Sequence, residues 1–128
     1  MSPSTAALVF GVLVAIVVLF QLALAAGAPW GHLAMGGRHP GRFPAKLRIG
    51  AVIQAGLLGL LALVVMGRAG LDVPLTTSWP AWTIWIPVVV SGLSLLMNLA
   101  TPSKAERRLW APVAAGMLGS SLVVALMG

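Results

Sequence analysis

The sequence predicts an all-α membrane protein, a bundle of four transmembrane helices, and three observations support this prediction. The 128 residues have a mean hydropathy of +1.03. Only 8% of them are charged, whereas a soluble domain carries about 25%. The charged residues also divide the chain into four apolar stretches, each near the roughly 20 residues that a spanning helix needs. Together these observations exclude a soluble domain and a disordered chain.

The four spans follow one another with almost no chain left outside the membrane. They are expected over residues 5–28, 47–67, 79–100 and 107–127. The first is interrupted only by Gln21, and the second lies between Arg48 and Arg68. The third occupies most of an uncharged stretch, and the fourth begins beside a pair of arginines. Residues 1–128 therefore form a single membrane domain.

The basic residues predict how the chain is oriented. Seven of the eight lie in the first and third connections or at their edges: Arg38, Arg42, Lys46, Arg48, Lys104, Arg107 and Arg108. Basic residues accumulate in cytoplasmic loops, so both termini are expected on the non-cytoplasmic side of a bacterial inner membrane. The same rule explains the net charge of +6 without a nucleic-acid partner.

An internal echo predicts how the helices pack. Residues 48–64 and 108–124 share seven identities at a constant offset of 60, as two tandem hairpins related by an axis along the membrane normal would. Small residues recur at every fourth position in both segments: Ala51, Ala55, Gly59, Ala111, Ala115 and Gly119. Such residues let membrane helices approach closely. The pattern leaves open whether the two segments meet each other or another protomer.

The chemistry available to this chain is limited. Cysteine is absent, which excludes disulfides, thiolate metal sites and cysteine nucleophiles. Asp72 and Glu106 are the two carboxylates, and they lie too far apart in sequence to suggest an acid–base pair. Ser103 and Glu106 also match a helix capping box, which predicts a structural role for Glu106. The sequence therefore favours a non-enzymatic protein and identifies neither a cofactor nor a metal site.

Two groups of polar residues are candidate ligand-binding residues. The first is Gln21, Gln54 and Asn98, expected about 8, 4 and 12 Å below the membrane midplane from their distance to the helix ends. They could bind a small ligand or a lipid head group, or they could hold the bundle together through interhelical hydrogen bonds. The bonding role is the more common one for amides in membrane helices.

The second group lies in a proline- and glycine-rich loop over residues 29–46, and comprises His32, Arg38, His39 and Arg42. Two histidines without an acid or thiol nearby make a poor metal site. The arginines and the backbone of Gly36 and Gly37 could cradle a phosphate. Alternatively, the loop is a rigid interfacial segment whose arginines contact anionic lipid head groups.

The strings APWGHLAMGGRHPGRFPAKLR and LMNLATPSKAERRLWAP give the chain a family resemblance. It resembles a group of small four-span bacterial integral membrane proteins. The resemblance covers essentially the whole chain and implies the four-helix topology and a bacterial source. It implies no activity and no site residues.

Three hypotheses for the function follow. The leading one is an accessory or assembly subunit of a larger membrane complex, because the chain has no catalytic constellation and almost no extramembrane mass. The second is a homo-oligomeric channel or carrier, with Gln21, Gln54 and Asn98 lining a path. The third is a protein that binds lipid or an anionic head group through the loop. The expected partners are the lipid bilayer and either further copies of the chain or the subunits of a complex.

Overall fold

The computed structural model describes residues 1–72 and 79–127, and this part of the chain is all-helical. The four long helices are α1 (Pro3–Ala26), α2 (Ala45–Arg68), α3 (Trp85–Ala100) and α4 (Lys104–Met127). A short 3-10 turn, η3 (Ala81–Ile84), runs directly into α3. With this turn included, all four helices are long and apolar enough to cross a membrane. The chain is thus a multi-pass membrane protein of the four-helix-bundle class, as its composition predicts.

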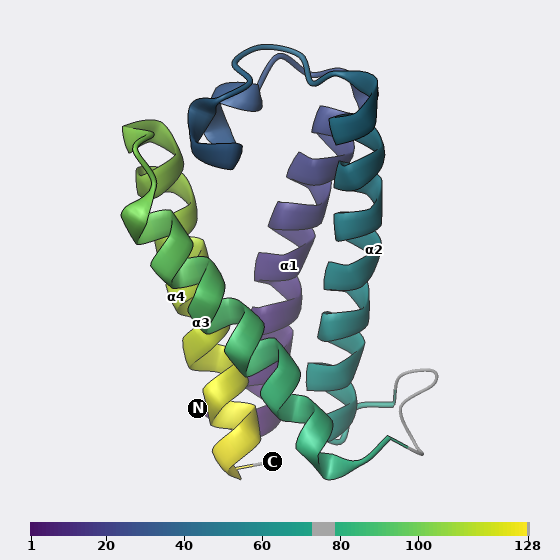
Figure 1. Cartoon of the computed structure of the whole chain (residues 1–128). Helices are drawn as coiled ribbons and strands as arrows, with labels where there is room; N and C mark the ends of the chain where they lie inside the picture. The colour runs from purple at the N-terminus through teal and green to yellow at the C-terminus, as the bar shows by residue number, and fades with distance from the viewer. Residues whose placement is uncertain (73–78, 128) are drawn as a thin grey trace.

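The helices form two antiparallel hairpins, α1–α2 and α3–α4, and both chain ends lie at the end of the bundle opposite the α1–α2 loop (Figure 1). Helix α1 packs against α2 on one side and α4 on the other, whereas α2 and α3 contact each other only sparsely. A two-fold relation between the hairpins would have matched the α1–α4 contact with an equal α2–α3 contact. The two hairpins are present, but their mutual packing does not have that symmetry.

The two ends of α1 show how local sequence defines a helix. The Ser2 hydroxyl accepts a hydrogen bond from the Thr5 N–H at 3.2 Å, so it caps the first turn. Gly27 ends the helix with a φ of +100°, a left-handed conformation that favours glycine. The Arg48 Nε then donates to the carbonyl oxygen of Ala25 at 2.7 Å. This arginine of α2 therefore completes the carboxyl end of α1, where positive charge is favourable.

The apolar core has two parts. The larger cluster lies toward the chain termini. Its residues come from α1, α2, η3 and α4: Ala6, Ala7, Phe10, Val14, Leu58, Val65, Ile84, Met117 and Val124. The smaller cluster lies near the α1–α2 loop and contains Phe20, Leu24, Phe43, Ala51 and Trp110. Between the second cluster and α3, the interior is hollow.

The small residues singled out from the sequence are only partly placed in helix contacts. Ala51, Ala55 and Ala111 are buried, whereas Ala115 and Gly119 are exposed and Gly59 is half-buried. A Cβ atom added at Gly59 or at Gly119 would have no neighbouring atom within 4 Å. Neither glycine therefore makes a close helix contact within one chain, and the alternative, a contact with another protomer, stays a prediction.

The close approach involves Gly116 instead. A Cβ atom added at Gly116 would lie 2.7 Å from Cδ1 of Leu13 on α1. Ser120, one turn further along α4, is also buried, and its hydroxyl donates back to the Gly116 carbonyl at 2.7 Å. A spacing of four thus correctly indicates small residues at a packing face. The face of α4 that meets α1 contains Gly116 and Ser120, each one position after Ala115 and Gly119.

Candidate functional site

A cavity of about 780 Å³ lies between the two hairpins, beneath the α1–α2 loop. Its size is in the range of small-molecule binding sites. All four helices and the loop contribute to its wall. Its polar lining residues are Gln21, Arg38, Gln54, Ser94, Asn98, Thr101 and Glu106. Since these residues are spread over most of the chain, only the tertiary fold assembles this polar lining.

The three amides expected from the sequence all line this cavity, and each comes from a different helix. Gln21 belongs to α1, Gln54 to α2 and Asn98 to α3. The Asn98 Nδ2 donates to the carbonyl oxygen of Ser94, one turn back in its own helix, at 2.7 Å. The side chains of Gln21 and Gln54 form no hydrogen bond with the described residues. The amides therefore do not join the helices to one another, which leaves them available to a ligand.

The loop covers the cavity because it folds back on itself. The N–H of Gly31 donates to the carbonyl oxygen of Gly41 at 2.9 Å, which closes the segment into a compact unit. A Cβ atom at Gly31 would collide with the His39 carbonyl oxygen, so only glycine permits this close approach. Between these points lie two short 3-10 turns, η1 (Gly31–Leu33) and η2 (Met35–Gly37).

Three hydrogen bonds then attach the loop to α4 and to the turn before it. The Trp110 Nε1 donates to the carbonyl oxygen of Leu33 at 2.8 Å. The Ser103 hydroxyl donates to the carbonyl oxygen of His32 at 3.1 Å. In the third bond, the N–H of Gly36 donates to Oε2 of Glu106 at 2.8 Å. The loop is therefore a structured cover over the cavity.

Glu106 has a larger role than the capping box predicts. The expected first half of the box is present, because the Glu106 N–H donates to the Ser103 hydroxyl at 3.3 Å. The second half is absent: the Ser103 N–H donates to Oγ1 of Thr101, and the Glu106 carboxylate turns toward the cavity. Its Oε2 accepts from Gly36 and, at 3.2 Å, from the Thr101 hydroxyl. The residue Glu106 as a whole is 9% exposed, and these described partners are all neutral.

The four loop residues expected from the sequence do not all line this cavity. Arg38 lines the cavity, whereas His32, His39 and Arg42 lie elsewhere in the loop. The ring of His39 packs edge-on against Phe43, with ring centroids 6.2 Å apart. The guanidinium of Arg42 lies over Gly27 at the end of α1. No group of three or more metal-binding side chains gathers anywhere in the described part of the chain.

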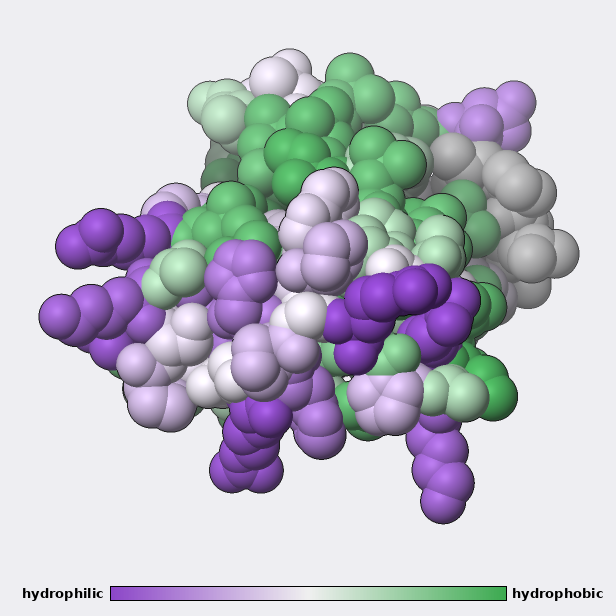
Figure 2. All heavy atoms as spheres, turned by 90° about the horizontal axis from the view of Figure 1, so that it is seen from above, coloured by the Kyte–Doolittle hydropathy of each residue, from purple (hydrophilic) through white to green (hydrophobic). Residues whose placement is uncertain are grey.

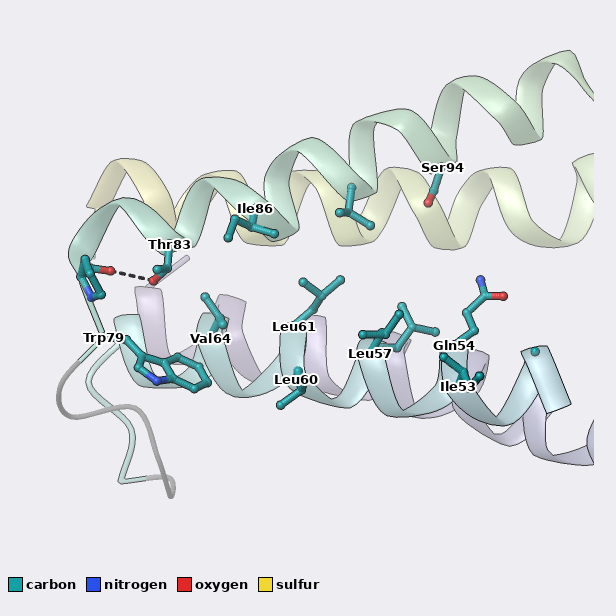
Figure 3. A pocket seen from close by; sticks show the side chains of 14 residues that line it. Ile53, Gln54, Leu57, Leu60, Leu61, Val64, Trp79, Thr83, Ile86 and Ser94 are labelled. Atoms are coloured by element: carbon teal, nitrogen blue, oxygen red, sulfur yellow. Dashed lines mark hydrogen bonds between the residues drawn. The ribbon is translucent and has the colours of Figure 1, made fainter.

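A second hollow, an apolar groove of about 870 Å³, separates α2 from α3. Its walls are mostly aliphatic: Ile53, Leu57, Leu58, Leu60, Leu61, Val64, Ile86 and Val90. Figure 3 shows Gln54 and Ser94 facing each other across one end of the groove and Trp79 at the other. From Gly50 to Val64 the groove follows α2 for about 21 Å, at 1.5 Å per residue.

The groove and the cavity adjoin each other. Gly50, Gln54, Leu58 and Ser94 line both. Of the two hollows, the one beneath the loop carries more polar side chains, and the one between α2 and α3 is long and largely apolar. Seen from the loop end, most hydrophilic side chains gather in the lower and left parts of the view, and hydrophobic surface lies above them (Figure 2). The first and third connections place basic residues at this end.

Sequence reasoning found the amides and Arg38 but not Glu106, Thr101 or the groove. The one available signal for Glu106 was its position as the sole acid among the basic residues of that end. No protein-family model, curated protein or solved structure matches this chain. The function therefore has to be inferred from the geometry of this site.

Proposed function

We propose that this protein binds a membrane lipid, with the polar head in the cavity beneath the loop and a hydrocarbon chain in the groove between α2 and α3. The supporting observation is that the two hollows adjoin at Gln54 and Ser94, which line both. A chamber with several polar side chains beside a long aliphatic groove matches the two parts of an amphiphile. The long apolar groove does not suit a wholly polar ligand.

The groove is suited to hydrocarbon because of where it lies. It lies between two spanning helices, and its rim residues Ile53, Leu57 and Leu60 are exposed. Lipid chains are as apolar as these side chains, so nothing drives α2 and α3 together to expel them. The groove covers about 21 Å of a hydrocarbon core that is about 30 Å thick. An acyl chain entering from the bilayer would therefore be accommodated along most of its length.

The geometry gives less support to the other two hypotheses. The homo-oligomeric channel would need its path between copies of the chain, because within one chain the buried cluster around Phe10, Val14 and Met117 fills the half nearer the chain termini. In that half, the hydroxyls of Ser120 and Ser121 bond to carbonyls of their own helix. The accessory-subunit role, which the sequence favoured, has no specific surface to support it.

The orientation forms part of the proposal. The loop end carries seven of the eight basic residues, so it faces the cytoplasm of a bacterial inner membrane, and both termini lie outside. The lipid head is then bound at the cytoplasmic interface. A reporter enzyme that works only in the cytoplasm should be inactive when fused after residue 128. Strong activity of that fusion would reverse the orientation.

The lipid-binding proposal is tested by blocking the groove. Val90 lines it, whereas its neighbour Val89 is exposed on α3 and does not. Val90→Trp adds a large side chain inside the groove, whereas Val89→Trp adds the same side chain outside it. Wild type and Val89→Trp, purified in mild detergent, should retain lipid in native mass spectra, and Val90→Trp should lose most of it. Equal retention by the two variants, or a lipid-free wild type, would overturn the proposal.

A further inference from the structure

Two opposite charges line the cavity without forming an ion pair. Glu106 and Arg38 both contribute to its wall, yet the described hydrogen bonds of the carboxylate all go to the neutral Gly36 and Thr101. Both of these bonds use Oε2, and Oε1 has no hydrogen-bond partner among the described residues. Glu106 is a nine-tenths buried residue, and a ligand cation would give its carboxylate the counter-charge that the described partners do not supply.

The loop brings the backbone of Arg38 close to Glu106. Gly36 donates directly to Glu106 at 2.8 Å, and Arg38 follows Gly36 by two residues, a stretch of chain that spans at most about 7 Å. Arg38 is an exposed residue and Glu106 a buried one, and both line the same cavity. A ligand that carries an anion and a cation on a short linker therefore finds a residue of opposite charge for each on one cavity wall.

The surroundings of Glu106 also favour a cation. The cavity wall includes Met97, Asn98 and Ala100 from the last turn of α3, and a helix carboxyl end attracts positive charge. The rings of Phe20 and Trp110 line the same cavity with their centroids 4.7 Å apart. Aromatic faces attract ammonium groups.

We infer that the cavity recognises the zwitterionic head of an amine-bearing phospholipid. The ammonium group donates to Oε1 of Glu106, and the phosphate accepts from the guanidinium of Arg38. This inference rests on the proposed function and adds the chemical class of the lipid. It also replaces the purely anionic head group expected from the sequence, because an anion without an ammonium would leave the Glu106 carboxylate unmatched.

The test compares head groups that have identical acyl chains. Wild-type protein is stripped of lipid and mixed with equal amounts of phosphatidylethanolamine and phosphatidylglycerol, and the bound ratio is read from native mass spectra. Phosphatidylethanolamine should be preferred about tenfold, since a hydrogen bond to a charged group contributes on that scale. Phosphatidylcholine, whose ammonium has no N–H to donate, should bind less than phosphatidylethanolamine.

Two variants test whether Glu106 is the residue that recognises the ammonium group. Glu106→Gln keeps an acceptor oxygen for Gly36 and Thr101 but removes the charge, so the preference should fall to near unity while lipid is still bound. Asp72→Asn, which neutralises the carboxylate outside this cavity, should keep the full preference. Equal binding of the two lipids by wild type, or an unchanged preference in Glu106→Gln, would overturn the inference. In either case, continued lipid binding that is sensitive to Val90→Trp would leave the proposed function standing.

Discussion

The α1–α4 contact and the α2–α3 gap are built from similar apolar helices, yet one is closed and the other open. At the α1–α4 contact, Gly116 leaves so little room that a Cβ atom would touch Leu13, and Ala6, Ala7 and Ser120 are buried. Across the α2–α3 gap, most of the facing side chains are leucines, isoleucines and valines. Helices α1 and α4 therefore approach closely where Gly116 removes side-chain bulk.

This difference is expected for helices surrounded by hydrocarbon. In water, the leucines of α2 and α3 would be driven together, because burial removes apolar surface from the solvent. In a bilayer, that drive is absent, and packing between small residues decides which helices join. An open gap between these two helices therefore carries no hydrophobic penalty in a bilayer, and under the proposed function a lipid chain occupies it.

The largest contrast should come from truncating one side chain in each region. Phe10 is fully buried, whereas Leu57 is 57% exposed to the groove and bilayer. Phe10→Ala should cost less than the about 3–5 kcal/mol seen in water-soluble cores, because the transfer from water is missing, but more than Leu57→Ala. Unfolding in mixed detergent micelles measures both. Equal losses would mean that the gap is packed as tightly as the core.

Replacing glycine with leucine should change the unfolding free energy very differently at two positions of α4. Gly116→Leu forces a side chain against Leu13, and overpacking of this kind costs about 1–3 kcal/mol. Gly119→Leu meets open space and should change the unfolding free energy by no more than about 0.5 kcal/mol. Thermal melts of the two variants in one detergent make the comparison. A larger loss at Gly119 would point to a contact with another copy of the chain.

A smaller effect is expected where the loop meets α4. Trp110→Phe keeps most of the ring but removes the Nε1–H donor to the Leu33 carbonyl, which costs about 1 kcal/mol. The loop should become more sensitive to protease. Trp82→Phe alters a 63% exposed ring in η3, far from the loop, and serves as the control. If both variants are cut at the wild-type rate, the bond does not hold the loop.

The smallest effect concerns the two loop arginines. Arg38 lines the cavity and Arg42 lies over Gly27, so only the first should contact a phosphate. Lysine preserves the charge but lacks the planar fork of arginine. Arg38→Lys should therefore weaken phospholipid retention a few-fold, and Arg42→Lys should leave it unchanged. The reverse result would move the head group out of the cavity.

Much of the fold could be predicted because membrane insertion depends on patterns that are local in sequence. The positions of charges marked the four helices, and distance from the helix ends placed Gln21, Gln54 and Asn98 at similar depths. The rotation of each helix about its axis could not be predicted in this way. Ala115 and Gly119 have the spacing of a packing face, but that face points outward, and only contacts from α1 decide this. Glu106 was assigned to a cap because a local motif accounted for it, while its partner Gly36 lies 70 residues earlier.

The bond from Arg48 to the Ala25 carbonyl has a consequence for how the protein is made. The residue that completes the end of α1 belongs to the next helix, 23 positions later. That carbonyl has its protein partner only after the start of α2 has been synthesised and has reached the interface. The first hairpin is therefore the smallest unit that can enter the membrane with the Ala25 carbonyl hydrogen-bonded by the chain itself. The Arg48 side chain thus joins the two helices of the first hairpin at the end where most of the basic residues lie.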